Sequence, residues 1–154
     1  MDWDRFAGDC QNVEVGRAVA AALAELLEHQ KAKLEIGVSE RAIAGQLMAY
    51  LKPHFPGLEV DVEYDRMGTV PKEVSWDRDP ARVFPDIIVH VPMTNEQNVL
   101  AVEIKKSNNR QGRDDDLRKL GAYRRELDYQ NALFLEIGVG DDAGEIDWVW
   151  VTEP

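Results

Sequence analysis

The segment "FPDIIVHVPMTNEQNVLAVEIKKS" (residues 84–107) contains two short apolar runs joined by a turn-rich connection, which predicts a β-hairpin. Asp86 opens the first run, and Glu103 and Lys105 close the second. Because side chains alternate along a strand, Glu103 and Lys105 share one face. Antiparallel pairing would bring Asp86, near the start of one strand, close to both. The sequence therefore predicts that three ionisable groups converge at one end of a sheet.

Such a convergence has two physical explanations. Two adjacent carboxylates repel each other unless a cation joins them. Lys105 could be that cation, which would make a structural ion triad. Alternatively, the cation could be a divalent metal ion. Two carboxylates suit Mg²⁺, which keeps several water ligands. Glu40 falls inside the apolar stripe of a predicted helix, either as an inward-facing ligand or as a first-turn acid favoured by the helix dipole.

Hydrophobic spacing outside the hairpin predicts an α/β sandwich with a mixed sheet. We expect helices over 12–33, 39–52 and 114–130, and strands over 58–64, 131–139 and 146–152, with a hairpin or mobile flap over 65–82. One domain spans 1–154, as an N-terminal helical extension (1–38), a core (39–139) and a C-terminal strand (140–154). The apolar stripe of the first helix needs cover, so we also expect a homodimer through that helix or the last strand.

Charge is distributed unevenly along the chain. The net charge of −11 argues against a protein that coats nucleic acid non-specifically. The stretch 105–125, however, holds eight basic and three acidic residues, so it carries +5 while the rest carries −16. This stretch fits a solvated loop and helix as well as a surface that meets phosphates.

The sequence also bears on location. No apolar run approaches the roughly 20 residues of a membrane span. The acidic start "MDWDRFAGDC" lacks the order of a signal peptide, and the single Cys10 cannot form an internal disulfide. We therefore expect a cytoplasmic protein with no membrane contact.

The hairpin residues resemble a known family. Pro85-Asp86, a gap of sixteen residues (87–102) and Glu103-Ile104-Lys105 look like the signature of the PD-(D/E)XK nuclease superfamily, the restriction-endonuclease-like phosphodiesterases. The resemblance implies a core of one helix, three strands, a helix and a fourth strand. The predicted elements match that order from Ser39 to about Val139, with an extra N-terminal helix and C-terminal strand.

The resemblance also implies roles for individual residues. Asp86 and Glu103 would bind Mg²⁺, or Mn²⁺ in its place, with the carbonyl oxygen of Ile104 as a further ligand. Lys105 would activate the attacking water or stabilise charge on the phosphate. Glu40 matches the extra acid that many members carry on the first core helix, and would serve the metal and catalysis as well.

The helix after the hairpin carries a second, partial match. Lys119 and Tyr123 have the spacing of the Gln-x-x-x-Tyr motif of recombination-exonuclease branches, with Lys in place of Gln. Asp116, Lys119, Tyr123 and Gln130 fall on one side of this helix, as either a site-facing surface or a polar shoulder. The residues expected to contact nucleic acid are Lys106, Arg110, Arg113, Arg118, Lys119 and Tyr123.

Three functions follow from these observations. The first is a metal-dependent nuclease, with DNA favoured over RNA as its substrate. The second is a catalytically silent nuclease fold that serves as a binding or assembly module, with a protein partner, in a defence, repair or phage system. The third is an unrelated α/β fold with a structural ion triad.

Overall fold

The structure is a computed structural model that describes residues 1–62, 66–67, 70–71, 73–75, 80–82, 85–91, 97–109 and 111–152. Its helices are α1 (Trp3–Gly8), α2 (Val13–His29), α3 (Lys31–Glu35), α4 (Glu40–Leu51) and α5 (Arg113–Glu126), with 3₁₀ turns η1 (Lys52–His54) and η2 (Gly140–Asp142). Its strands are β1 (Glu59–Val62), β2 (Arg66–Met67), β3 (Val70–Pro71), β4 (Glu73–Ser75), β5 (Pro80–Arg82), β6 (Ile87–His90), β7 (Leu100–Lys106), β8 (Asn131–Ile137) and β9 (Ile146–Trp150).

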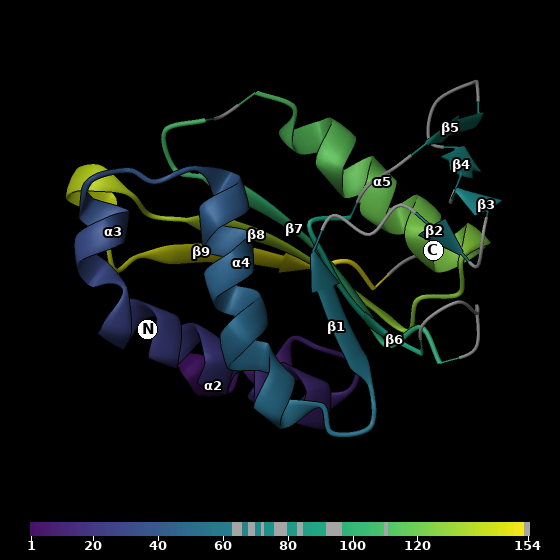
Figure 1. The fold of residues 1–154 in the computed structure, drawn as a ribbon, viewed down its shortest axis with the longest axis horizontal. Coiled ribbons are helices and arrows are strands. Elements are labelled where there is room, and N and C mark those ends of the chain that lie inside the picture. The colour runs from purple at the N-terminus through teal and green to yellow at the C-terminus, as the bar shows by residue number, and fades with distance from the viewer. Residues whose placement is uncertain are drawn as a thin grey trace.

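Five strands form the main sheet, in the order β1-β6-β7-β8-β9 (Figure 1). Strands β6 and β7 pair antiparallel, with Ile87 opposite Val102 and Ile88 opposite Ala101, which confirms the predicted hairpin. Strands β7 and β8 pair parallel. A parallel pair needs a long crossover connection, and α5 supplies it. The mixed sheet is thus a direct result of placing a helix between β7 and β8.

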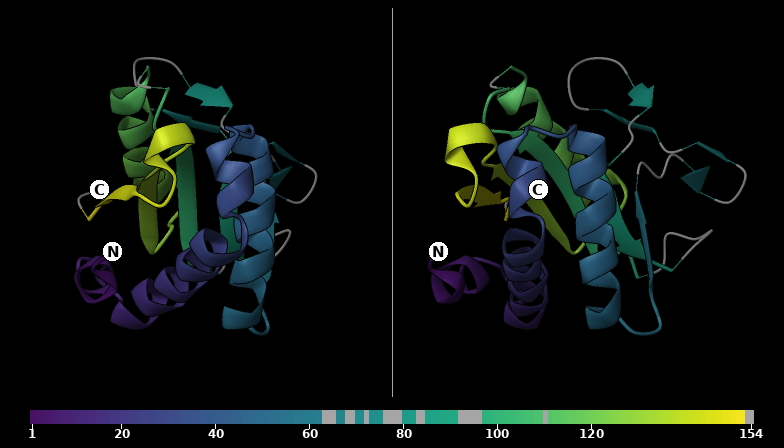
Figure 2. Two further views of the ribbon diagram at one scale, coloured as in Figure 1. Left: turned by 90° about the vertical axis from the view of Figure 1, so that its left-hand side faces the viewer. Right: turned by 60° about the vertical axis from the view of Figure 1, so that its left-hand side comes forward.

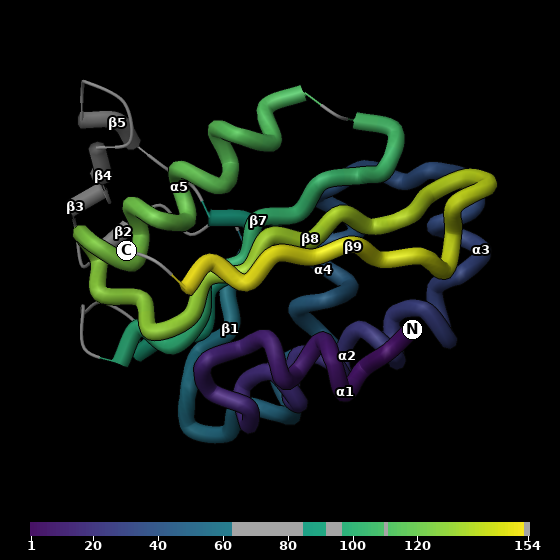
Figure 3. Tube along the Cα trace, turned by 180° about the vertical axis from the view of Figure 1, so that it is seen from behind, coloured from purple at the N-terminus to yellow at the C-terminus, as the bar shows by residue number. Residues whose placement is uncertain are grey.

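Helices cover both faces of this sheet (Figure 2). On one face, α2 and α4 pack their leucines, Leu23, Leu26, Leu47 and Leu51, against β6, β7 and β8 in the larger hydrophobic cluster. On the other face, α5 lies along the sheet, and its Leu120 joins a smaller cluster (Figure 3). The order α4-β1-β6-β7-α5-β8 is the predicted helix, three strands, helix and strand. The α/β fold with a mixed sheet is confirmed.

Several element boundaries differ from the sequence-based expectation. The helix expected over 12–33 is two helices, α2 and α3. Asn12 is the N-cap of α2 and accepts hydrogen bonds from the backbone nitrogens of Glu14 and Val15, and α2 ends at His29. Helix α1 was not predicted. The described parts of 65–82 form two short hairpins, β2–β3 and β4–β5. Gln130 lies beyond the end of α5, so it does not share a helix face with Asp116.

The apolar stripe of α2 is covered by the protein's own chain. Val15, Val19 and Leu23 are buried against the sheet and the neighbouring helices. At the last strand, Trp148 and Trp150 pack on Phe6 of α1, with ring centroids 5.4 Å apart in each pair. An exposed stripe on the first helix was one reason for expecting a homodimer, and that reason is wrong. Dimerisation itself stays a prediction.

The contact between α1 and α2 generates a testable prediction. A Cβ atom at Gly16 would lie 2.6 Å from the carbonyl oxygen of Ala7 and 2.8 Å from its Cα, which are backbone atoms with little room to move. Gly16→Ala should therefore lower the free energy of unfolding by about 1–3 kcal/mol, although alanine favours helix. Urea unfolding measures this change.

Gly45, in the middle of α4, is the matched control. An added Cβ there meets nothing within 4 Å. Gly45→Ala should therefore raise stability by about 0.5–1 kcal/mol, the ordinary helix-propensity gain. If both substitutions stabilise the protein equally, the close approach of α1 to α2 is not a real constraint.

Candidate active site at the β6 and β7 strand ends

Asp86 and Glu103 lie side by side at the ends of adjacent strands. Asp86 immediately precedes β6, and the register of Ile87 with Val102 continues to place it opposite Glu103. The Oδ2 atom of Asp86 accepts a hydrogen bond of 2.6 Å from the backbone nitrogen of Ile104. The two carboxyl groups are close enough for each to raise or lower the pKa of the other. The predicted convergence of these two acids is what the structure shows.

Burial disfavours the ionised form of both carboxyl groups. Burial raises the pKa of Asp86 to about 6, and the hydrogen bond from the backbone nitrogen of Ile104 partly offsets this rise. Glu103 is more deeply buried, and its pKa is raised well above its usual range by burial and then by the charge of Asp86. A proton or a cation must therefore accompany the pair at neutral pH.

Helix α5 lies over Glu103 and supplies it with a fixed donor. The buried Tyr123 hydroxyl donates a hydrogen bond of 2.9 Å to Oε1 of Glu103. Burial and the charge of Glu103 raise the pKa of Tyr123, so the phenol keeps its proton and remains a donor. Tyr123 therefore orients one oxygen of Glu103.

Lys105 has partners other than those expected. Its ammonium donates a hydrogen bond of 2.6 Å to the carbonyl oxygen of Gln111 and lies 2.9 Å from Oδ2 of Asp116. Both side chains of this ion pair are only 11% exposed. The start of α5 packs over the end of β7 and brings Asp116 to Lys105. An ion triad of Lys105 with Asp86 and Glu103 is therefore not what forms.

Asp116 connects two lysines, and the sequence interpretation gave it no role in the site. Its Oδ1 atom lies 3.4 Å from the ammonium of Lys119, one helical turn further along α5. The spacing of Asp116, Lys119 and Tyr123 along one helix side was the available signal. Which of these side chains would meet Lys105 or Glu103 depended on how α5 docks on the sheet.

Glu40 occupies a different position from the carboxyl pair. Its Oε2 atom accepts hydrogen bonds from the backbone nitrogen of Lys106, at 3.0 Å, and from the side-chain amide of Asn109, at 3.1 Å. Within the described residues, no three or more His, Cys, Asp or Glu side chains form a group that could hold a metal ion. Glu40 thus fastens the end of β7 and the segment after it to α4, and its part in a metal site stays a prediction.

Four of the eight basic residues in the stretch 105–125 form ion pairs with nearby acids, namely Lys105, Arg113, Arg118 and Lys119. The Arg113 guanidinium lies 4.8 Å from the ring centroid of Phe134, and 3.7 and 3.6 Å from carboxylate oxygens of Glu136 and Asp147. Arg118, which is exposed, pairs with Asp115. Arg110 lies outside the described residues. The positive charge that this stretch offers to phosphates is therefore smaller than its net charge indicated.

Comparisons with known proteins add little to this geometry. No family model matches the sequence, and no curated protein matches it. Among solved structures, the fold is similar to the crystal structure of SSO0001, with a TM-score of 0.42 and 16% identity over 89% of this chain and 76% of that one. None of the helices in the described part of the chain is long and apolar enough to cross a membrane.

The carboxyl pair predicts a characteristic pH dependence of stability without metal. Because the pKa of Asp86 is about 6 in the folded state against an ordinary 3.8, folding favours the protonated form. Its contribution is complete below pH 3.8 and is lost as the pH rises through 6. Asp86→Asn keeps an acceptor for Ile104 and removes the charge. At pH 8, this variant should be more stable than wild type by about 1–3 kcal/mol.

Urea unfolding in EDTA at several pH values measures this difference. It should shrink toward zero as the pH falls to 4. Asp141→Asn, on the exposed 3₁₀ turn η2, is a control that should show no such gain. A variant less stable than wild type at pH 8 would show that the Asp86 charge is well compensated in the folded protein.

Proposed function

We propose that this protein is a metal-dependent nuclease of the PD-(D/E)XK type. One observation carries the proposal: two carboxyl groups, the half-buried Asp86 and the buried Glu103, lie opposite each other at adjacent strand ends, with Lys105 two residues beyond Glu103 on β7. A divalent cation would replace the proton that the pair otherwise needs and would relieve its repulsion. The donor set fits Mg²⁺, which usually takes one or two carboxylates and completes its shell with waters and phosphate oxygens. Mn²⁺ is the alternative ion.

A bound metal ion would supply a water of lowered pKa and would neutralise charge on the phosphate. The protein's own residues prepare the site for it. Asp86 is held by the backbone of Ile104, and Glu103 is oriented by Tyr123. Lys105, held by Asp116, offers an ammonium for the charge that develops on the phosphate.

The proposal predicts cleavage of nucleic acid that requires Mg²⁺ or Mn²⁺ and stops with EDTA. Asp86→Asn and Glu103→Gln should each abolish it, because each removes one of the two charged ligands, while the fold survives. Single- and double-stranded DNA and RNA should be tested with either metal, with circular dichroism as the control for folding. If wild type stays inert on all four substrates with both metals, the nuclease proposal fails.

Substitutions of Lys105 and Arg118 should have different effects, the first on turnover and the second on substrate binding. Lys105→Ala should lower turnover by about two orders of magnitude or more and leave substrate binding in Ca²⁺ within a few-fold. Arg118→Ala, on an exposed position of α5, should instead weaken binding and reduce the log–log salt slope by about one. Normal cleavage by Lys105→Ala would make its ammonium a structural counter-ion of Asp116.

A second candidate function is a catalytically silent module that binds a protein partner or assembles with one. The contacts of Lys105 with Asp116 and with the carbonyl oxygen of Gln111 favour this candidate, because the ammonium already has two partners in the structure. The charge of −16 outside the basic stretch also suits a protein partner. Absence of cleavage together with an intact fold would select this candidate.

A further inference from the structure

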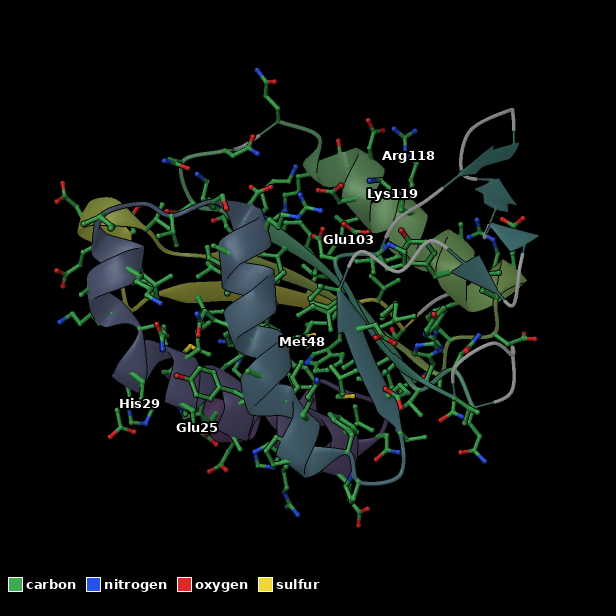
Figure 4. The ribbon with its side chains drawn as sticks, in the orientation of Figure 1. Glu25, His29, Met48, Glu103, Arg118 and Lys119 are labelled. Carbon is green, nitrogen blue, oxygen red and sulfur yellow. The ribbon has the colours of Figure 1, made fainter. Side chains whose placement is uncertain are left out.

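One side of α5 faces the polar residues of β7 through three side chains at successive turns. Asp116 pairs with Lys105, and Tyr123 donates to Glu103. Lys119 lies between them on the same helix side, half-buried, and pairs with Asp116. Figure 4 shows Lys119 near Glu103, with Arg118, the preceding residue, directed to the outside of the helix. Among the described residues, the docking of α5 therefore places Lys119 on the helix side that faces the carboxyl pair, between the contacts that Asp116 and Tyr123 make with β7.

The charges around Lys119 agree with this placement. Burial alone lowers the pKa of Lys119, but the negative charges of Glu103, Asp116 and Asp86 outweigh it and raise the pKa. Reciprocally, Lys119 is the cation that favours ionisation of Glu103. Lys105, whose ammonium is turned to Asp116, does not serve the pair in this way.

We propose that Lys119 is a built-in counter-ion of the Asp86–Glu103 pair, and that a divalent metal binds there in competition with its charge. The inference rests on the proposed metal site. In the metal-free protein, Lys119 shares its charge between Asp116 and the carboxyl pair. When a divalent cation joins the pair, repulsion moves the ammonium toward Asp116, which is already within 3.4 Å. Lys119 thus weakens metal binding and stabilises the metal-free state.

The test compares Mn²⁺ binding to wild type and to Lys119→Gln by isothermal titration calorimetry at low ionic strength. Removing a cation on the helix side that faces the ligands should strengthen Mn²⁺ binding by about tenfold, since a charge in a half-buried site is only partly screened. The metal-free variant should unfold at a lower temperature than wild type at pH 8, and Mn²⁺ should raise its unfolding temperature by a larger increment.

Two further variants serve as controls. Lys119→Arg keeps the charge and should bind Mn²⁺ within a few-fold of wild type. Arg125→Gln removes an equal charge from an exposed position on the same helix and should leave the affinity unchanged. It separates the local effect of Lys119 from the change in net charge.

The outcomes separate this inference from the proposed function. Tighter Mn²⁺ binding by Lys119→Gln alone supports the inference. Equal or weaker binding by Lys119→Gln, with clear binding by wild type, overturns the inference and leaves the metal site standing. If neither protein binds Mn²⁺, the proposed metal site fails, and the competition fails with it. An equal gain in Arg125→Gln would make the effect one of net charge and would also overturn the inference.

Discussion

Two carboxyl groups buried side by side cannot both be charged unless a proton or a cation stays with them, and the polar part of this structure is arranged around that constraint. Asp86 and Glu103 are in this position because antiparallel pairing of β6 and β7 brings one strand start next to the other strand's end. Glu103 is buried and Asp86 is half-buried, since β6 and β7 run through the middle of the sheet. Their neighbours must therefore supply hydrogen-bond donors and positive charge.

Helix α5 meets most of that demand, and it does so as part of the fold. It connects the parallel strands β7 and β8, so it has to cross the face that carries Glu103 and Lys105. Its apolar residues, including Leu120, anchor it to the smaller hydrophobic cluster. The adjoining helix side then lays Asp116 and Tyr123 on the polar residues of β7. Apolar packing on one side of α5 thus sets the polar contacts on the other.

The two opposite faces of the sheet contribute unequally to the site. Glu40 comes from α4 on the face opposite α5, and it accepts hydrogen bonds from the backbone of Lys106 and the side chain of Asn109. This fixes the segment that leads from β7 toward Gln111, whose carbonyl oxygen accepts from Lys105. Glu40 therefore influences the site through the path of the backbone. Its carboxylate adds a negative charge that raises the pKa of Asp86 from a distance.

The amino-acid sequence by itself determined the α/β class, the β6–β7 hairpin and the meeting of Asp86 with Glu103. These depend on local periodicity: alternating side chains and a short turn leave one register that keeps both strands buried. Helix ends could not be predicted as well, because the cap at Asn12 and the separation of α2 from α3 depend on a few local hydrogen bonds. A helix as short as α1 has too few residues to show a period.

Only the tertiary structure decided which charges pair. The sequence placed Lys105 two residues from Glu103, but its ammonium extends from a long, flexible side chain that can turn to any acid within reach. Docking of α5 on the sheet pairs Lys105 with Asp116 and places Lys119 on the helix side that faces the carboxyl pair. Such choices depend on the position of one element over another to within an ångström or two. Hydrophobic spacing determines which face of a helix is buried, and it does not determine which side chains meet across the contact.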